Sequence, residues 1–263
     1  MQADLITPTI VFAGLIGAIA WNLTTWWYGL PSSSSHALIG GVVGAALAAE
    51  GTKALVSGGL VGKVFIPALI APVLAFAVAG LGIVFAYRII GRLRPGSVNR
   101  GFRHGQIISG GLLALSHGTN DAQKTMGIIT LALIANGNLN ADNFEVPTWV
   151  VISAATAIAA GTYAGGWRII RTLGTRIIKM DPAQGFAAQG AGATVILASS
   201  HFGYPLSTTH TISGAIMGAG AAKRLSAVRW GVAGNIVTAW ILTFPGAAAI
   251  AALLYFATRP LFS

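Results

Sequence analysis

Two long apolar stretches, residues 64–88, which carry no charge before the final Arg88, and residues 230–258, which carry none, set the strongest limit on how this chain can fold. A helix needs about 20 predominantly apolar residues to cross a bilayer, and backbone polar groups in lipid must be paired within the structure. Only 8% of the 263 residues are charged, whereas soluble domains carry about a quarter charged residues. The sequence therefore predicts an all-α polytopic membrane protein, located in the cell membrane.

Sixteen Lys and Arg against six Asp and Glu give a formal net charge of +10, and the basic residues lie mainly between the apolar stretches. Most fall in three clusters: Arg88, Arg92, Arg94, Arg100 and Arg103; Arg168, Arg171, Arg176 and Lys179; and Lys223, Arg224 and Arg229. By the positive-inside rule we expect these connections in the cytoplasm, and the acidic connections at Asp4, Glu50, Asp142 and Glu145 outside. Topology thus accounts for the charge without a nucleic-acid partner. The chain has no cysteine, which excludes disulfides and thiolate sites.

We expect one transmembrane domain over residues 1–263, with spans at 64–88, 148–170 and 230–258. Residues 105–137 are also apolar, but this stretch is longer than the roughly 20 residues that a straight span requires. A broken transmembrane helix is therefore expected there.

Two further segments are interrupted by polar residues near their centres. Residues 185–222 contain "GYPLSTTH" and have basic residues at both ends, so a re-entrant helical hairpin satisfies the charge rule where a single span would not. Residues 8–49 contain "GLPSSSSH" and have Asp4 and Glu50 at their ends. The sequence predicts two re-entrant hairpins that enter the membrane from opposite faces.

The two hairpins are related in sequence, because "GLPSSSSHALIGGVVGAALA" (29–48) aligns without gaps with "GYPLSTTHTISGAIMGAGAA" (203–222). The matched pairs are Gly29/Gly203, Pro31/Pro205, Ser33/Ser207, His36/His210, Gly40/Gly214, Gly44/Gly218 and Ala48/Ala222. Shared sequence in opposite orientation is typical of the inverted repeats of secondary transporters. We assign a partial first repeat to 1–90 and a second repeat to 105–258. The four-residue spacing of the matched small residues favours close helix packing.

The hairpin tips are candidate anion sites. A proline followed by hydroxyl side chains is a good helix start, and the N-terminus of a helix attracts anions. The candidate substrate-binding residues are Ser33, Ser34, Ser35 and His36 in the first tip, and Ser207, Thr208, Thr209 and His210 in the second. The alternative is that the hydroxyls only cap half-helices and that the histidines brace the tips.

The segment "SHGTNDAQKTMG", residues 116–127, is the second candidate site. Unwinding near Gly118 would free carbonyls that could hold a cation together with Asn120 and Asp121, which makes these two residues a candidate sodium site. Gln123 and Lys124 complete the set proposed to contact a coupling ion or substrate. The alternative is that Asp121 and Lys124, three residues apart in a helix, pair and neutralise each other.

These motifs together resemble the PiT family of inorganic phosphate transporters, solute-carrier family 20. The resemblance rests on "WNLTTWWYGLPSSSSHALIGG", "SHGTNDAQKTMGII" and "PLSTTHTISGAIMGAGAAKR", and the "NDAQK" form is similar to bacterial low-affinity members. It implies a homodimer in a lipid bilayer that carries phosphate with a proton or sodium ion, or as a neutral metal-phosphate complex. No other cofactor and no enzymatic activity are implied.

One departure from the family pattern concerns the first repeat. The family has an Asn-Asp motif ahead of both hairpins, and this sequence has one, at Asn120 and Asp121. The first repeat is thus expected to lack its opening helices, as in an N-terminal truncation. Two other functions stay open at this point: a transport-inactive truncated homologue, and an intramembrane serine hydrolase. The hydrolase is disfavoured because adjacent Ser35 and His36 are poorly placed as nucleophile and base.

Overall fold

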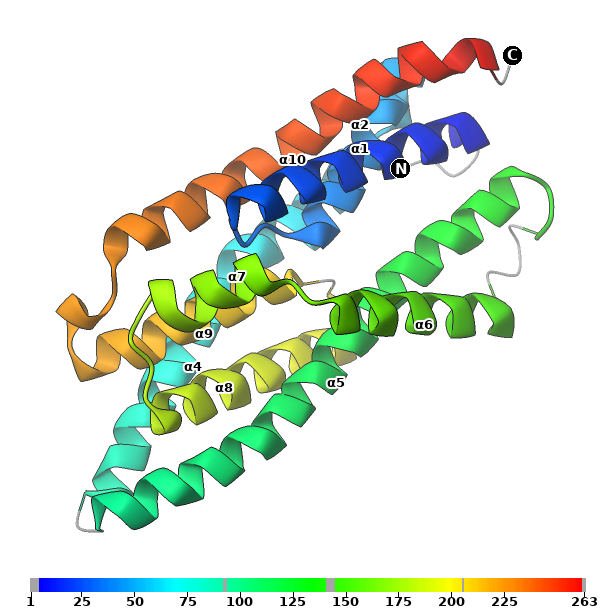
Figure 1. Cartoon of the computed structure of the whole chain (residues 1–263). Helices are drawn as coiled ribbons and strands as arrows, with labels where there is room; N and C mark the ends of the chain where they lie inside the picture. Colours follow the sequence, from blue (N-terminus) through cyan, green and yellow to red (C-terminus); the bar gives the residue numbers. More distant parts are fainter. Residues whose placement is uncertain (1–4, 92–93, 141–144, 205, 262–263) are drawn as a thin grey trace.

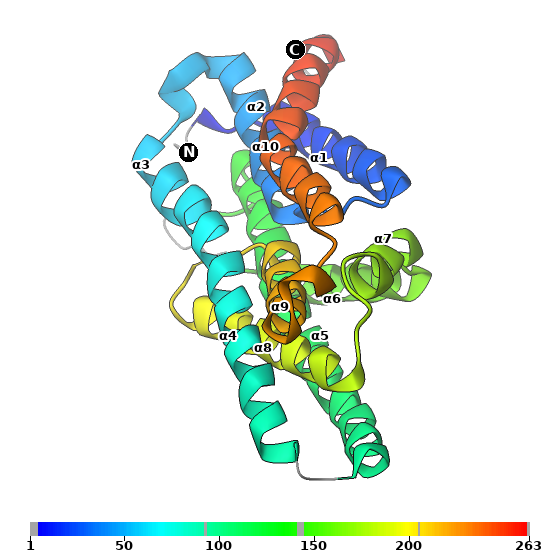
Figure 2. The same ribbon diagram turned by 90° about the vertical axis from the view of Figure 1, so that its left-hand side faces the viewer.

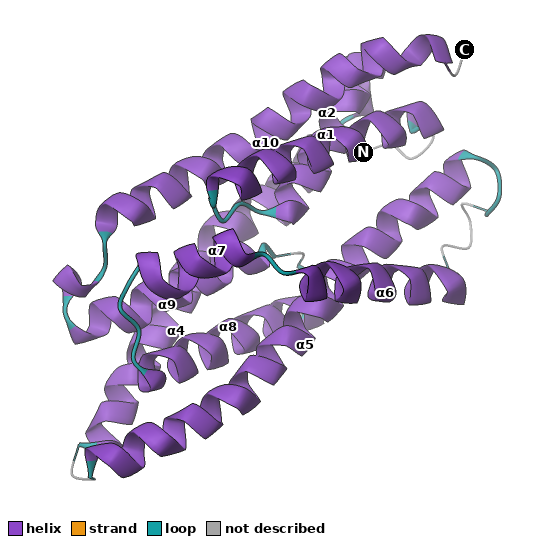
Figure 3. Ribbon diagram, in the orientation of Figure 1, coloured by secondary structure: helices purple, strands orange, loops and turns teal. Residues whose placement is uncertain are grey.

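The computed structural model describes residues 5–91, 94–140, 145–204 and 206–261. Asp4, Arg92, Asp142 and Pro205, which are among the residues named above, lie outside these ranges. The described residues form helices joined by loops, with no strand among them (Figure 3). Their helices are α1 (Pro8–Tyr28), α2 (Ser34–Glu50), α3 (Ser57–Leu60), α4 (Ile66–Ile90), α5 (Pro95–Ala135), α6 (Thr148–Ala164), α7 (Trp167–Arg171), α8 (Pro182–His201), α9 (Thr208–Lys223) and α10 (Trp230–Thr258).

Four helical stretches are long and apolar enough to cross a membrane: Pro8–Tyr28, Ser34–Ala54, Gly58–Ile89 and Trp230–Thr258. A fifth crossing is available if Thr148–Ala164 and Trp167–Arg176, which are bent by 61° to each other, act as one span. The prediction of an all-α polytopic membrane protein is confirmed.

The two predicted hairpins are formed by α1 with α2 and by α8 with α9. They point toward the middle of the molecule from opposite ends (Figures 1 and 2). The rings of His36 and His210, near the two tips, lie with their centroids 4.9 Å apart. Gly29 and Gly203, a matched pair of the repeat, both have a left-handed backbone, with φ of 66° and 72°. Each hairpin therefore reverses at the same kind of glycine turn.

The predicted break within residues 105–137 is wrong in its position. Helix α5 continues without interruption from Pro95 to Ala135, 41 residues, and runs as one ribbon in Figure 1. Near the expected break, the Thr119 hydroxyl donates to the Leu115 carbonyl one turn earlier, at 2.9 Å. This polar group is thus paired within the helix and does not require the helix to unwind. At 1.5 Å per residue α5 is about 60 Å long and exceeds the thickness of the hydrocarbon core. The length of 105–137 thus reflects an overlong helix.

A break does occur in the segment expected to be the simple span 148–170. Helix α6 ends at Ala164, Gly165 has a φ of 81°, and α7 begins at Trp167. A positive φ suits glycine and few other residues, so the sequence allows the chain to turn sharply here. The broken span of the fold is therefore this bent pair, on the C-terminal side of α5.

The matched glycines bring each hairpin against the long helix of the other repeat. An added Cβ at Gly44 in α2 would lie 2.1 Å from the carbonyl oxygen of Ala248 in α10. An added Cβ at Gly218 in α9 would lie 2.0 Å from the carbonyl oxygen of Phe76 in α4. Such distances leave no room for a methyl group. The hairpin arm of the first repeat thus packs on α10 of the second, and the arm of the second on α4 of the first.

The outer end of the second hairpin is fixed by Asp181. Its carboxylate caps α8 by accepting from the backbone N–H of Gln184 at 2.9 Å, accepts from the Tyr87 hydroxyl at 3.0 Å, and pairs with Lys223 at 3.2 Å. Burial raises the pKa of this carboxyl, but these hydrogen bonds and the charge of Lys223 outweigh burial and leave its pKa below the usual 3.8. Asp181 thereby connects α4, α8 and the end of α9.

Gly44→Ala should destabilise the fold, because the new methyl group would overlap the backbone of α10. Overpacking of this kind costs about 1–3 kcal/mol, which predicts a melting temperature lower by several degrees in detergent. Gly82→Ala is the matched control in a span, since a Cβ there meets nothing within 4 Å. Equal melting temperatures for the two variants would contradict the close approach of α2 and α10.

Asp181→Asn should lower stability at neutral pH by about 1 kcal/mol, because asparagine keeps the cap but loses the charge. The folded state holds the pKa of Asp181 below 3.8, so the carboxylate contributes in full above that pH and ceases to contribute as pH falls through the lower, folded value. Melting curves of parent and variant at pH 7, 5 and 3 test this. A difference that does not shrink at the lowest pH would refute it.

Candidate functional site

The helices α2 and α9 begin in the same way at the two tips. The Ser33 hydroxyl accepts from the backbone N–H of His36 at 3.1 Å, and the Ser207 hydroxyl accepts from that of His210 at 3.2 Å. Both serines are buried. Each is the cap residue of its helix, so capping, the alternative considered for the tip hydroxyls, does occur at these two positions. The positive ends of the two helix dipoles lie at these capped tips.

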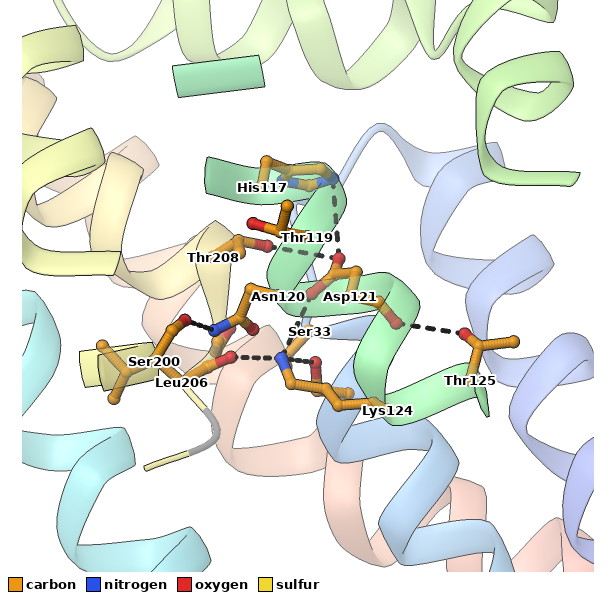
Figure 4. Close-up of polar contacts among 12 residues, drawn as sticks. Ser33, His117, Thr119, Asn120, Asp121, Lys124, Thr125, Ser200, Leu206 and Thr208 are labelled. Carbon is orange, nitrogen blue, oxygen red and sulfur yellow. Dashed lines mark hydrogen bonds and ion pairs between the residues drawn. The ribbon is translucent and has the colours of Figure 1, made fainter. Parts of the chain in front are cut away.

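Lys124 connects the two tips to α5 (Figure 4). Its ammonium donates to the Ser35 hydroxyl of the first tip at 2.7 Å, and to the Leu206 carbonyl of the second at 2.5 Å. Its third contact is the carboxylate Oδ1 of Asp121 at 3.1 Å, one turn away in α5. The alternative in which Asp121 and Lys124 pair is therefore what the structure contains.

The second carboxylate oxygen of Asp121 faces the second tip and the preceding turn of α5. Oδ2 lies 3.5 Å from the Thr208 hydroxyl and 3.5 Å from Nε2 of His117. The Asp121 side chain is 16% exposed, and that of Lys124 is 13% exposed. An ion pair so little exposed is only weakly screened by solvent and salt.

Asn120 lies beside the pair with one of its two polar atoms free. Its side-chain amide donates to the Ser200 hydroxyl at 2.9 Å, whereas Oδ1 is buried and has no hydrogen-bond partner among the described residues. An orphaned carbonyl oxygen suits a cation or a donor on a ligand. Among the described residues, this site included, no group of three or more His, Cys, Asp or Glu side chains is placed to hold a metal ion.

The two tip histidines pack against each other and against Trp240. The His210 ring stacks on Trp240 with centroids 4.1 Å apart, and His36 meets His210 edge-on. Trp240 also donates its indole N–H to the carbonyl of Pro31 at 3.0 Å, which ties α10 to the first tip. Both histidines are buried. Trp240 was not predicted, because one tryptophan within an apolar span carries no signal of its own.

A second unpredicted contact holds the outer side of the first tip. The Thr172 hydroxyl, in the helical segment that follows α7, donates to the Gly29 carbonyl at 2.8 Å. The Arg168 guanidinium donates to the Trp27 carbonyl and lies 4.4 Å above the Trp27 ring. In the sequence, the basic cluster that contains Arg168 indicates only which side of the membrane this connection lies on. The contacts of Arg168 and Thr172 with the tip depend on the bend between α6 and α7, which brings them there.

The structure brings most of the predicted site residues into one network. They are Ser33, Ser35, His36, Asp121, Lys124, Ser207, Thr208 and His210. Asn120 is next to Asp121 in α5, and its side chain bonds to Ser200. Ser34 and Gln123 are exposed, and Gln123 lines a cavity of about 830 Å³ along α5 and α6. Thr209 is half-buried. These three side chains lie outside the contacts that join the tips.

The sequence matches the model of the phosphate transporter family over residues 1–100 and 91–251. A probable low-affinity inorganic phosphate transporter of Mycobacterium tuberculosis is 51% identical over 255 residues, 97% of this chain and 61% of that protein. Proteins described in the same words from Rhizobium meliloti and Bacillus subtilis are 51% and 42% identical, over 98% and 96% of this chain and 76% and 75% of their own lengths. The chain thus spans about 61% of the length of the mycobacterial relatives.

A solved structure titled "The sodium-dependent phosphate transporter" has a similar fold, with a TM-score of 0.86. The match covers 99% of this chain and 83% of the other, at 22% sequence identity. At that identity the likeness concerns the arrangement of helices.

Trp240→Phe should loosen the first tip, because phenylalanine can still stack on His210 but cannot donate to Pro31. Loss of one hydrogen bond, about 1 kcal/mol, predicts roughly fivefold faster amide exchange in residues 29–33. Hydrogen–deuterium exchange measured by mass spectrometry tests this. Trp230→Phe is the control, since Trp230 makes an equivalent bond to Leu225 away from the tips. Equal exchange at 29–33 in both variants would contradict the role of Trp240.

Proposed function

Since this chain belongs to the phosphate transporter family, we propose that it is a secondary transporter that carries inorganic phosphate across the membrane. It is a multi-pass membrane protein, and its relatives are named as transporters and not as enzymes. The observation that most supports the proposal is the contact of one ammonium, that of Lys124, with both hairpin tips. Two opposed helix starts and a buried cation together form a place suited to an anion.

The proposed anion site uses the hydroxyls and backbone N–H groups of the two tips. A tetrahedral phosphate offers four oxygens, and donors that approach from opposite sides could bond to different oxygens at once. We assign substrate contact to Ser33, Ser34, Ser35 and His36 of the first tip, and to Ser207, Thr208, Thr209 and His210 of the second. Of these, Ser33 and Ser207 would contribute mainly by holding the helix starts in place, because their hydroxyls already cap them.

The charge of Asp121 is compatible with this assignment because Lys124 pairs with it. An unpaired carboxylate would repel phosphate strongly at low dielectric. Coupled transport requires that a co-transported cation and phosphate each improve the binding of the other. A proton, a sodium ion or a divalent metal in a neutral complex with phosphate would meet this electrostatic requirement. Homodimeric assembly in the bilayer is part of the same proposal.

The contacts of Ser35 do not favour the serine hydrolase considered from the sequence. Its hydroxyl accepts a hydrogen bond from the Lys124 ammonium, so a cation and not an imidazole base engages this oxygen. A nucleophilic serine requires a base that takes up its proton.

Asp121→Asn and the double variant Ser207→Ala/Thr208→Ala should each lower uptake of radiolabelled phosphate into proteoliposomes by about tenfold or more. The first removes the carboxylate that holds the Lys124 ammonium between the tips, and the second removes two tip hydroxyls. Glu145→Gln and Thr156→Ala, which change exposed residues far along the chain from the tips, are the controls. Parental uptake in both site variants would rule out the assignment of these residues.

A further inference from the structure

We propose that the Lys124 ammonium takes the place of a sodium ion in this site, so that the chain binds and carries phosphate without sodium. This rests on the proposed phosphate transport and specifies which cation completes the site. The ammonium is attached to α5 through the lysine side chain, and it would supply the positive charge that a bound sodium ion would otherwise supply.

The contacts of Lys124 are those of a bound cation. Three oxygens of different kinds surround Nζ at 2.5–3.1 Å: a hydroxyl from Ser35, a carbonyl from Leu206 and a carboxylate from Asp121. Hydroxyl, carbonyl and carboxylate oxygens are also the ligands that a hard metal cation takes in proteins. The three ligands come from α2, the loop before α9, and α5, so the ammonium joins the same elements that a shared ion would join.

A sodium ion beside Asp121 would meet Lys124 at close range. One oxygen of this carboxylate is already bonded to the ammonium, and the other faces Thr208 and His117. A sodium ion here would place a second positive charge near the ammonium, and the single negative charge of Asp121 would have to be shared between the two cations. The unpartnered Oδ1 of Asn120 is available to a ligand, but one neutral oxygen offsets little of the repulsion between the two cations. The residues present thus fit a sodium ion poorly at Asp121.

The fixed charges around the tips balance a singly charged anion without a further cation. Lys124 and Asp121 cancel, and each helix N-terminus contributes roughly half a positive charge. The two helix N-termini together therefore offset about one negative charge. Monobasic phosphate has that charge, so its binding leaves no deficit for sodium to fill.

The experiment compares phosphate binding and uptake in sodium chloride and in choline chloride. Equilibrium binding of radiolabelled phosphate is measured on the full chain in detergent, and uptake is measured in proteoliposomes. The variants are Lys124→Met, which removes the charge, and Lys124→Arg, which keeps it. Lys63→Met, at an exposed lysine, is the matched control. Melting temperatures and gel filtration establish that each variant is folded.

We expect equal phosphate binding by the parent in both salts. Lys124→Met should bind at least about tenfold more weakly in choline and recover part of this loss in sodium, whereas Lys124→Arg should keep most sodium-free binding. A merely structural lysine would not make binding depend on sodium. The inference is overturned if the parent requires sodium, or if the methionine and arginine variants lose sodium-free binding equally. In those cases phosphate transport itself stands. If the parent neither binds nor carries phosphate in either salt, the proposed function fails and the inference fails with it.

Discussion

The rest of this structure depends on the start of a helix inside the protein, where the first backbone N–H groups are shielded from bulk water. The protein contains this arrangement twice, at Ser33 and at Ser207, and in each case a buried serine hydroxyl accepts from the N–H group three residues later. A buried helix start would be costly if these groups were unpaired. Capping removes part of the cost and leaves further N–H groups free to point at a ligand. The same constraint thus produces both a stable hairpin and a positively polarised tip.

The Lys124 ammonium relates the two tips to each other. The tips belong to different repeats and lie far apart in sequence, and α5 supplies a charged side chain that reaches both. The carboxylate that pairs with the ammonium, that of Asp121, also comes from α5 and not from either tip. The central helix therefore contributes both charges of the pair, and the hairpins contribute neutral oxygens. This division allows the tips to approach an anion without presenting negative side chains to it.

Much of the architecture follows from the sequence, because the signals that carry it are local or repeated. Apolar length and charge between the spans predict a polytopic membrane protein, and the match of Gly29 with Gly203 marks two turns that do have the same left-handed backbone. The position of the broken span was wrong, since Gly118 and its polar neighbours suggested unwinding and their hydroxyls instead bond within the helix.

Contacts between distant segments were the hardest to predict. The pairing of Asp121 with Lys124 was considered because they are three residues apart, whereas the reach of Lys124 to Leu206 depends on how the hairpins are placed. The same holds for Trp240 against His210 and for Thr172 against Gly29. A backbone carbonyl carries no mark in the sequence that identifies it as a ligand.

The glycine contacts between the two halves of the chain affect how such a gene can evolve after duplication. Each hairpin arm packs on a helix encoded in the other half, as Gly44 does on Ala248 and Gly218 does on Phe76. Copies of an ancestral unit would ordinarily be free to drift apart, since each could retain its own partners. Here a larger residue in one copy requires a compensating change in the other, so the two halves are under joint selection. The small residues at these crossings should persist long after the rest of the two copies have diverged.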